Sequence, residues 1–428
     1  ELGKLDEAET RYNQAIVLKP NYTSVYNNLG NTQKELGKLD EAEASYTQAL
    51  TIKPDFAEAY NNLGNTLKEM DRLDEAEASY TQAIKLKPHY AEAHYNLGII
   101  LKELGRLNEA TASYKKAISF KPAYVEAHNN LGVAFKESNR LNEAEASYIQ
   151  AIKLKPNYVE AHNNLGVLLK EQGKYNEAEV SYTQAIKLKP DYAEAYSNLG
   201  NALKELDRLD EAEASYARAI ILKPDYCEAH YNLAVTLQEL GIYSEAEQHY
   251  TQAIALKPDY AEVHNNLGVM LKNLGRLDEA EQHYTQAIAL KPDYAEAHRH
   301  LTSLKKFESQ DEQYAKMQEL YFNRKTSKEQ RCHINFSLAK ACEDLGNFKQ
   351  AYEHYIEGNT LRKKLLHYDI NHDIELFNQI QSKCSSQIIQ KSFELGKSSK
   401  HLTPIFIVGM PRSGTTLVEQ IISSHPQI

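Results

Sequence analysis

The stretch "AEAYNNLGNTLKEMDRLDEAEASYTQAIKLKP", residues 57–88, predicts two helices separated by a short turn. The first helix is expected over 57–70 and the second over 74–87. Asp74 is placed to cap the second helix, and Glu77, three residues later, would complete a capping box. Pro88 then ends the helix, because proline lacks the backbone N–H that a further turn needs.

The same pattern returns at a fixed period along most of the chain. Prolines stand 34 residues apart, at 20, 54, 88, 122, 156, 190, 224, 258 and 292. The capping pair recurs as Asp40/Glu43, Asn142/Glu145 and Asp278/Glu281. The turn position, which favours a left-handed residue, carries Gly37, Asp71, Gly105, Asn139 and Gly173. A fixed period of this length is typical of a solenoid built from helix pairs.

One unit resembles a tetratricopeptide repeat in its characteristic positions, which here are Tyr60, Leu63, Gly64, Ala76, Tyr80 and Pro88. Small residues such as Gly64 and Ala76 would let the two helices approach closely, with Tyr80 filling the space beyond. The resemblance implies a mainly α, superhelical solenoid. We expect a partial repeat over 1–22, eight repeats over 23–294, divergent or capping repeats over 295–366, an amphipathic helix and linker over 367–404, and the start of another domain over 405–428.

One asparagine recurs in the first helix of every full unit. The column consists of Asn28, Asn62, Asn96, Asn130, Asn164, Asn198, Asn232 and Asn266. The pattern is similar to the asparagine ladder of O-linked N-acetylglucosamine transferase, which implies a place on the concave side and a protein or peptide partner in that groove. Each amide offers a donor and an acceptor, as a peptide main chain requires. The alternative, that these asparagines only bond neighbouring repeats, stays open.

A second column, His94, His128, His162, His230 and His264, is interpreted as packing histidines. Neighbours lie one repeat apart, about 10 Å, which zinc bonds of about 2 Å cannot bridge; no metal site is predicted. The net charge of −10 argues against nucleic acid as the partner. No apolar run is long enough to span a membrane. The four cysteines lack zinc or disulfide spacing, which favours reduced thiols and a cytoplasmic location.

The last stretch, "IFIVGMPRSGTTLVEQIISSHPQI" (405–428), predicts a buried strand at 405–408, a loop and a helix. Such an arrangement directs free backbone N–H groups and the helix dipole at an anion. Gly409 and Gly414 have the spacing of a nucleotide triphosphatase loop, but Thr415 stands where its lysine belongs. Arg412 supplies the cation instead, so the loop suits a smaller anionic group than a triphosphate.

This loop resembles that of sulfotransferases that use 3′-phosphoadenosine 5′-phosphosulfate (PAPS), most closely the tyrosylprotein branch and bacterial proteins that join tetratricopeptide repeats to a sulfotransferase domain. The resemblance implies PAPS as co-substrate, without a metal, and transfer of its sulfuryl group to a hydroxyl such as a protein tyrosine. The residues implied in PAPS binding are Arg412, Ser413, Gly414, Thr415 and Thr416.

The family's catalytic base lies slightly beyond the "HP" of this motif, and the sequence stops there. We therefore expect a fragment, cut inside a repeat and inside a catalytic domain, that contains no catalytic residue and is inactive by itself. The alternative is a non-catalytic interaction scaffold. A glycosyltransferase would rest on the repeats alone, and the terminal loop argues against it.

Overall fold

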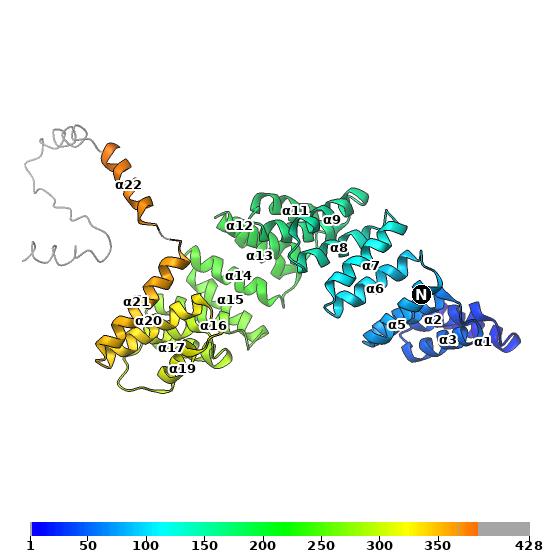
Figure 1. The fold of residues 1–428 in the computed structure, drawn as a ribbon, viewed down its shortest axis with the longest axis horizontal. Helices are drawn as coiled ribbons and strands as arrows, with labels where there is room; N and C mark the ends of the chain where they lie inside the picture. The colour runs from blue at the N-terminus through cyan, green and yellow to red at the C-terminus, as the bar shows by residue number, and fades with distance from the viewer. Residues whose placement is uncertain (1, 368, 384–428) are drawn as a thin grey trace, which may run out of the picture. The chain divides into compact units, whose positions relative to one another are not determined.

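The computed structural model describes residues 2–367 and 369–383, which form helices α1 to α22 and contain no strand (Figure 1). Within this part of the chain the predicted mainly α solenoid is confirmed. The strand expected at 405–408 lies outside the described residues. No helix among those described is long and apolar enough to cross a membrane.

The eight full repeats each contribute two helices. After α1 (Leu2–Leu18), the first helices are α2 (Thr23–Glu35), α4 (Ala57–Glu69), α6 (Ala91–Glu103), α8 (Val125–Glu137), α10 (Val159–Glu171), α12 (Ala193–Glu205), α14 (Cys227–Glu239) and α16 (Ala261–Asn273). The second helices are α3 (Leu39–Ile52), α5 (Leu73–Leu86), α7 (Leu107–Phe120), α9 (Leu141–Leu154), α11 (Tyr175–Leu188), α13 (Leu209–Leu222), α15 (Tyr243–Leu256) and α17 (Leu277–Leu290).

Each pair closes on a tyrosine of the second helix. Tyr80 is fully buried, and its ring lies so close to Gly64 that a Cβ atom there would be 2.7 Å from Cε1. Six other repeats show the same approach of glycine and tyrosine, and the seventh has Ala234 at the glycine position. The predicted close approach of the two helices is confirmed.

The turn between the paired helices has the predicted left-handed residue. Its φ is +77° at Gly37 and +60° at Asp71, and Asn139 and Asp207 are also positive. A backbone in this region costs a residue with a Cβ atom more than glycine, and Asp and Asn tolerate it best.

The predicted capping boxes of the second helices are wrong. The helix of residues 73–86 begins one residue earlier than expected, so Asp74 lies inside its first turn, and the N-cap Arg72 makes no side-chain capping bond. Arg72 instead places its guanidinium 2.6 Å from Glu43 of the preceding repeat and 2.6 Å from Glu75. The other capping pairs fail in the same way, because α3, α9 and α17 also begin one residue early.

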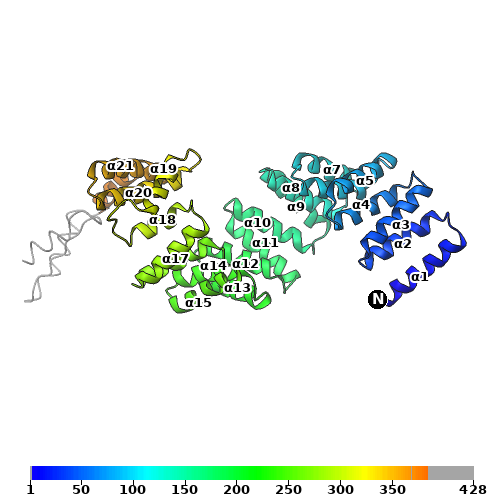
Figure 2. The same cartoon turned by 90° about the horizontal axis from the view of Figure 1, so that it is seen from below.

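Consecutive repeats stack so that each second helix packs against the next first helix, as Figures 1 and 2 show for α2 to α17. Successive first helices also contact one another, from α2 with α4 to α14 with α16. No contact of comparable size joins successive second helices in the described residues. The first helices therefore form the inner layer of the stack, where the asparagine column was expected.

The chain divides into two compact units between Met317 and Gln318. The first unit ends with α18 (Ala295–Thr302) and the beginning of α19 (Glu312–Phe322). The second contains the helix pair α20 (Lys328–Asp344) and α21 (Phe348–Leu365), followed by α22 (Ile370–Lys383). Ser327 and Gln330 form a true capping box at the start of α20. Of the amphipathic helix and linker expected over 367–404, the described part contains a helix, α22, as far as Lys383.

Candidate functional site

The asparagine column places one amide near the middle of each first helix. Asn28 lies on α2, and the following members lie on α4, α6, α8, α10, α12, α14 and α16. All but Asn28 are half-buried. The column therefore follows the inner layer of the stack, with one amide for each repeat.

Seven column asparagines use their side-chain Nδ2 to bond the preceding repeat. The acceptor is usually the residue just before that repeat's own column asparagine, 35 positions earlier. The bonds are Asn62 to Asn27 (3.1 Å), Asn96 to Asn61 (3.0 Å), Asn130 to Tyr95 (3.0 Å), Asn164 to Asn129 (3.0 Å), Asn198 to Asn163 (3.2 Å), Asn232 to Asn201 (3.1 Å) and Asn266 to Tyr231 (2.8 Å). We call this series the amide ladder. It shows that the asparagines do bond neighbouring repeats.

The ladder continues into the divergent ninth unit, where the column position is no longer asparagine. His300 of α18 occupies it and places its Nδ1 2.9 Å from the Oδ1 atom of Asn265. An imidazole N–H thus replaces the amide donor. The inner layer keeps the same hydrogen-bonded connection between its last two repeats.

Bonding between repeats leaves the carbonyl oxygen of most column amides unused, although Asn130 and Asn266 accept from the residue before them. The carbonyl oxygens of five column residues accept no hydrogen bond within the described residues, and they are not buried: Asn62, Asn96, Asn164, Asn198 and Asn232. Each amide is therefore held in one orientation by its Nδ2 bond, with the carbonyl oxygen available. Such an oxygen can accept from a peptide N–H.

The tyrosine acceptors of the ladder are neutral. Burial, together with the nearby Glu126 carboxylate, raises the pKa of Tyr95. Burial also raises the pKa of Tyr231 to about 12, with smaller contributions from Tyr260, Glu262 and Glu296. Both hydroxyls therefore stay protonated at physiological pH, and their oxygens accept from Asn130 and Asn266 without adding charge to the inner surface.

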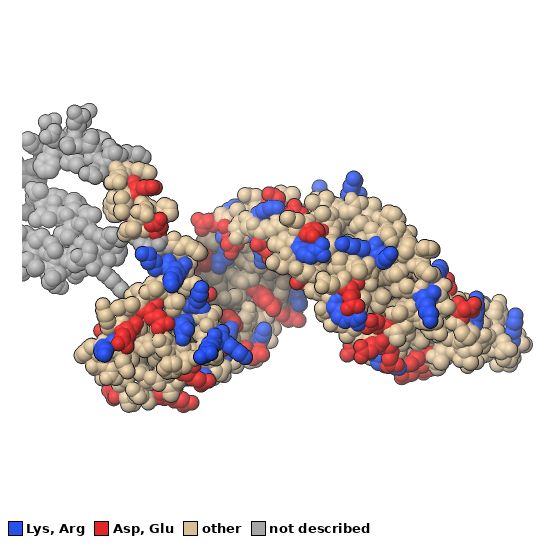
Figure 3. Space-filling view, viewed as in Figure 1, with Lys and Arg blue, Asp and Glu red and all other residues tan. Residues whose placement is uncertain are grey.

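Ion pairs between neighbouring repeats border the ladder. At the carboxyl ends of the first helices, Lys34 lies 3.1 Å from Glu69, and similar pairs join later repeats. At the amino ends of the first helices the pairs lie within one repeat: the Lys87 ammonium, 2.8 Å away, lowers the pKa of Glu58. Lys and Arg alternate with Asp and Glu over the face drawn in Figure 3, so neither sign dominates there. The surface thus favours a ligand recognised by hydrogen bonds over a highly charged polymer.

A polar pocket opens next to the ladder where α10, α11, α12 and α14 meet. Its lining is Lys170, Tyr175, Asn201, Lys204, Glu205 and Asn232. It includes one column amide, Asn232, together with both signs of charge. This composition suits a polar side chain of a bound peptide.

The acceptors of the ladder were not predicted from the sequence. A signal was present, because the residue before each column asparagine is itself polar, as at Asn61, Tyr95 and Asn129. The predicted PAPS-binding residues Arg412, Ser413, Gly414, Thr415 and Thr416 lie outside the described residues. Among the residues that the structure describes, no group of three or more His, Cys, Asp or Glu could hold a metal ion.

Several family models match parts of the chain. Two tetratricopeptide-repeat models match residues 227–260, 261–294 and 169–234. The model of the cilia and flagella-associated protein 70 C-terminal domain matches residues 1–188. A model described as the sulfotransferase family matches residues 404–428.

Several known proteins are similar to part of this chain. An uncharacterized protein of Aquifex aeolicus is 30% identical over 125 residues, which is 29% of this chain and only 16% of that protein. Solved structures include YrrB, described as a TPR protein with an unusual peptide-binding site (24% identity, 43% of this chain and 95% of that one, TM-score 0.38). Pseudomonas aeruginosa pilF is also similar (22% identity, 48% of this chain and 94% of that one, TM-score 0.44). So is the APC/C hetero-tetramer Cut9–Hcn1 (17% identity, 67% of this chain and 56% of that one, TM-score 0.48). The repeat matches and the stacked helix pairs together identify the first unit of this chain as a tetratricopeptide-repeat solenoid.

Proposed function

We propose that this chain is the repeat-bearing part of a PAPS-dependent sulfotransferase, whose amide ladder holds a polypeptide acceptor or partner. The solenoid itself is a scaffold for protein interaction. The observation that supports the enzymatic part is the sulfotransferase-family match at 404–428, which covers the loop with Arg412. The second candidate is a scaffold without catalysis, favoured by the extent of the repeats. The cytoplasmic location stays a prediction.

The residue types of the loop suit the proposed chemistry. Arg412 offers a planar, permanently charged fork for two anionic oxygens, and Ser413, Thr415 and Thr416 add hydroxyl donors. In the proposed reaction the acceptor oxygen bonds to sulfur while the sulfur–oxygen bond to the nucleotide phosphate breaks. Adenosine 3′,5′-bisphosphate leaves, and the acceptor's proton passes to a general base.

Arg412→Ala is expected to weaken binding of adenosine 3′,5′-bisphosphate by about 10- to 100-fold. A hydrogen bond to a charged group contributes about 1.5–3 kcal/mol, and the substitution removes the only cation of the loop. The measurement is titration calorimetry on the full-length polypeptide, with the exposed Arg218→Ala on α13 as the control. Undiminished binding by Arg412→Ala would show that the loop does not hold the nucleotide, and the scaffold would then be preferred.

Replacing Asn130, Asn164 and Asn198 together by alanine is expected to reduce peptide capture by tenfold or more. Three neighbouring amides, separated by two spacings of about 10 Å, span about six residues of extended peptide, and their removal deletes the bonds to the ligand main chain. The probe is a displayed library of random peptides about twelve residues long, panned against the wild-type chain, from which one enriched peptide is taken for affinity measurement.

The matched control removes the three acceptors and keeps the column. Tyr95→Phe, Asn129→Ala and Asn163→Ala break the same bonds between repeats. This triple variant should bind the peptide within a few-fold of wild type. Equal loss in both variants would mean that the ladder acts only through stability, and equal retention that the peptide binds elsewhere.

A further inference from the structure

Two histidine pairs join the paired helices of the seventh and eighth repeats. His230 of α14 and His249 of α15 place their Nδ1 atoms 3.0 Å apart, and His264 of α16 and His283 of α17 repeat this distance. The ring centroids are 5.2 Å apart in the first pair and 5.3 Å in the second. Because the two nitrogens are much closer together than the ring centroids, the rings meet at their Nδ1 edges.

The hydrogen bonds fix which nitrogens of His230 donate and accept. His230 Nε2 lies 3.0 Å from the carbonyl oxygen of Pro224, and a carbonyl only accepts, so Nε2 carries a proton. In the neutral ring Nδ1 is then an acceptor, and it accepts a hydrogen bond from the Nδ1–H group of His249. The two Nδ1 atoms are 3.0 Å apart, so only one of them can carry the proton that lies between the rings.

The ninth unit contains one further buried histidine, which is not part of a pair. His298 of α18 is fully buried, and its Nε2 lies 3.1 Å from the carbonyl oxygen of Pro292. Its Nδ1 is buried without a hydrogen-bond partner. Protonating Nδ1 would therefore place an N–H donor without an acceptor, and a positively charged ring, in the core. Both are costly.

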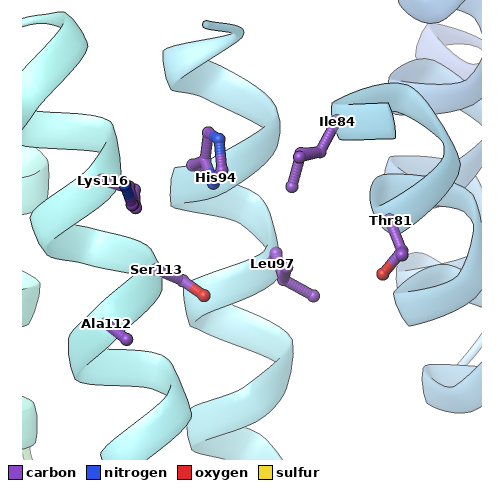
Figure 4. A pocket seen from close by; sticks show the side chains of 7 residues that line it. All are labelled: Thr81, Ile84, His94, Leu97, Ala112, Ser113 and Lys116. Atoms are coloured by element: carbon purple, nitrogen blue, oxygen red, sulfur yellow. The ribbon is translucent and has the colours of Figure 1, made fainter. Parts of the chain in front are cut away.

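The other repeats lack this arrangement. At the position of His249 and His283 they carry serine: Ser45, Ser79, Ser113, Ser147, Ser181 and Ser215. Figure 4 shows the third repeat, where an opening between α5, α6 and α7 is lined by His94 and Ser113. An imidazole at the serine position occupies the equivalent space in the seventh and eighth repeats. The second repeat, with Tyr60 and Ser79, has no histidine at either position.

The surroundings oppose protonation in all three units. Burial, and then the neighbouring imidazole, lowers the pKa of His249 and of His264. Burial also lowers the pKa of His283 and of His298. Of the charged groups that face these imidazoles, Arg276 and Lys316 also lower a histidine pKa, whereas Glu245, Glu247 and Glu279 act against the effect of burial.

We propose that repeats seven to nine, α14 to α18, form an acid-sensitive segment of the solenoid that opens when the pH falls below about 6.5, while the second repeat, α4 and α5, stays closed. The unfolded segment takes up protons near the ordinary histidine value, whereas the folded segment resists them. Stability is therefore fully present above about pH 6.5 and is lost as the pH falls from there toward the lowered folded values. Each histidine that stays neutral changes the opening equilibrium by up to about tenfold per pH unit.

The test is hydrogen exchange of the full chain at pH 7.5 and pH 5.5, corrected for the intrinsic exchange rate. Protection of the α14–α17 amides should fall by tenfold or more relative to α4 and α5. His249→Ser with His283→Ser installs the residue of the other six repeats and should remove most of this difference. An equal change in both segments, or a double variant that responds like wild type, would overturn the proposal.

Two further measurements keep the proposal testable if the double variant folds poorly. The ring resonances of His249 and His283 in the wild-type chain should titrate below pH 6.5, and titration above that value would overturn the proposal. Adding Zn²⁺ tests the alternative that the two facing imidazoles bind a metal ion. If Zn²⁺ at pH 7.5 raises protection of α14–α17 in wild type but not in the double variant, the pairs are metal ligands, and the pH device is rejected.

Discussion

Tyr182→Ala is expected to lower the free energy of opening of the fifth and sixth repeats by about 3–5 kcal/mol, as for other large-to-alanine substitutions in cores. Tyr182 of α11 is fully buried. Its ring lies against Gly166 of α10, and it shares a cluster with Leu169 of its own repeat and Ala202 of the next. The substitution thus removes contacts that close one repeat and contacts that join it to its neighbour.

Native-state hydrogen exchange of the α10, α11 and α12 amides measures this loss, because a solenoid need not unfold as one two-state unit. Tyr182→Phe is the control. The Tyr182 hydroxyl is buried without a hydrogen bond, so its removal should cost close to nothing. Tyr216→Phe should cost about 1 kcal/mol, since that hydroxyl donates to Asn201 at 2.8 Å. Similar losses for Tyr182→Ala and Tyr182→Phe would contradict the packing argument.

The helix pairs could be predicted from the sequence because several local signals agree in every repeat. Proline ends the second helix, the turn has a residue that tolerates positive φ, and the glycine–tyrosine pair fixes the approach of the helices. These signals act within one repeat, and the 34-residue period copies them along the chain. Local signals repeated at a fixed distance are therefore sufficient for the fold.

The capping prediction failed because the second helices begin one residue earlier than the cap residue type implies, at Leu73 in the second repeat. Asp74 has the residue type of a cap, but Arg72 two positions earlier bonds both Glu43 and Glu75. With Leu73 already helical, the carboxylate of Asp74 lies in the first turn, where it faces the positive end of the helix dipole. The same early start occurs in α9, where the side chain of Arg140 bonds only Glu143 of its own repeat among the described residues, so the helix start does not depend on a contact between repeats.

The candidate site was predicted only in part because its hydrogen bonds join different repeats. The column of asparagines is visible in the sequence, but its acceptors lie 35 residues earlier and change between asparagine and tyrosine. The histidine pairs are less visible still, since the second histidine follows 19 residues after the first and only in two repeats. Comparing each column across repeats, and asking where a serine becomes histidine, would have found them.

Gly166→Val is expected to lower the free energy of opening of the fifth repeat by about 3 kcal/mol, at the upper end of the cost of overpacking. A Cβ atom at Gly166 would be 2.6 Å from Cε1 and 2.7 Å from Cδ1 of Tyr182. The ring cannot move away freely, because Tyr182 is fully buried and packs against the next repeat. Valine has a better helix propensity than glycine, but the gain of a few tenths of a kcal/mol is small beside the clash.

Gly166→Ala is the control that the chain itself suggests. The seventh repeat carries Ala234 beside the fully buried Tyr250, so one methyl group can be accommodated. Its smaller clash should be largely offset by alanine's propensity advantage of about 1 kcal/mol. In the Tyr182→Ala background the ring is absent, and Gly166→Val should then cost at least 1 kcal/mol less than in wild type. Strictly additive effects of the two substitutions would show that the valine acts elsewhere than on the tyrosine ring.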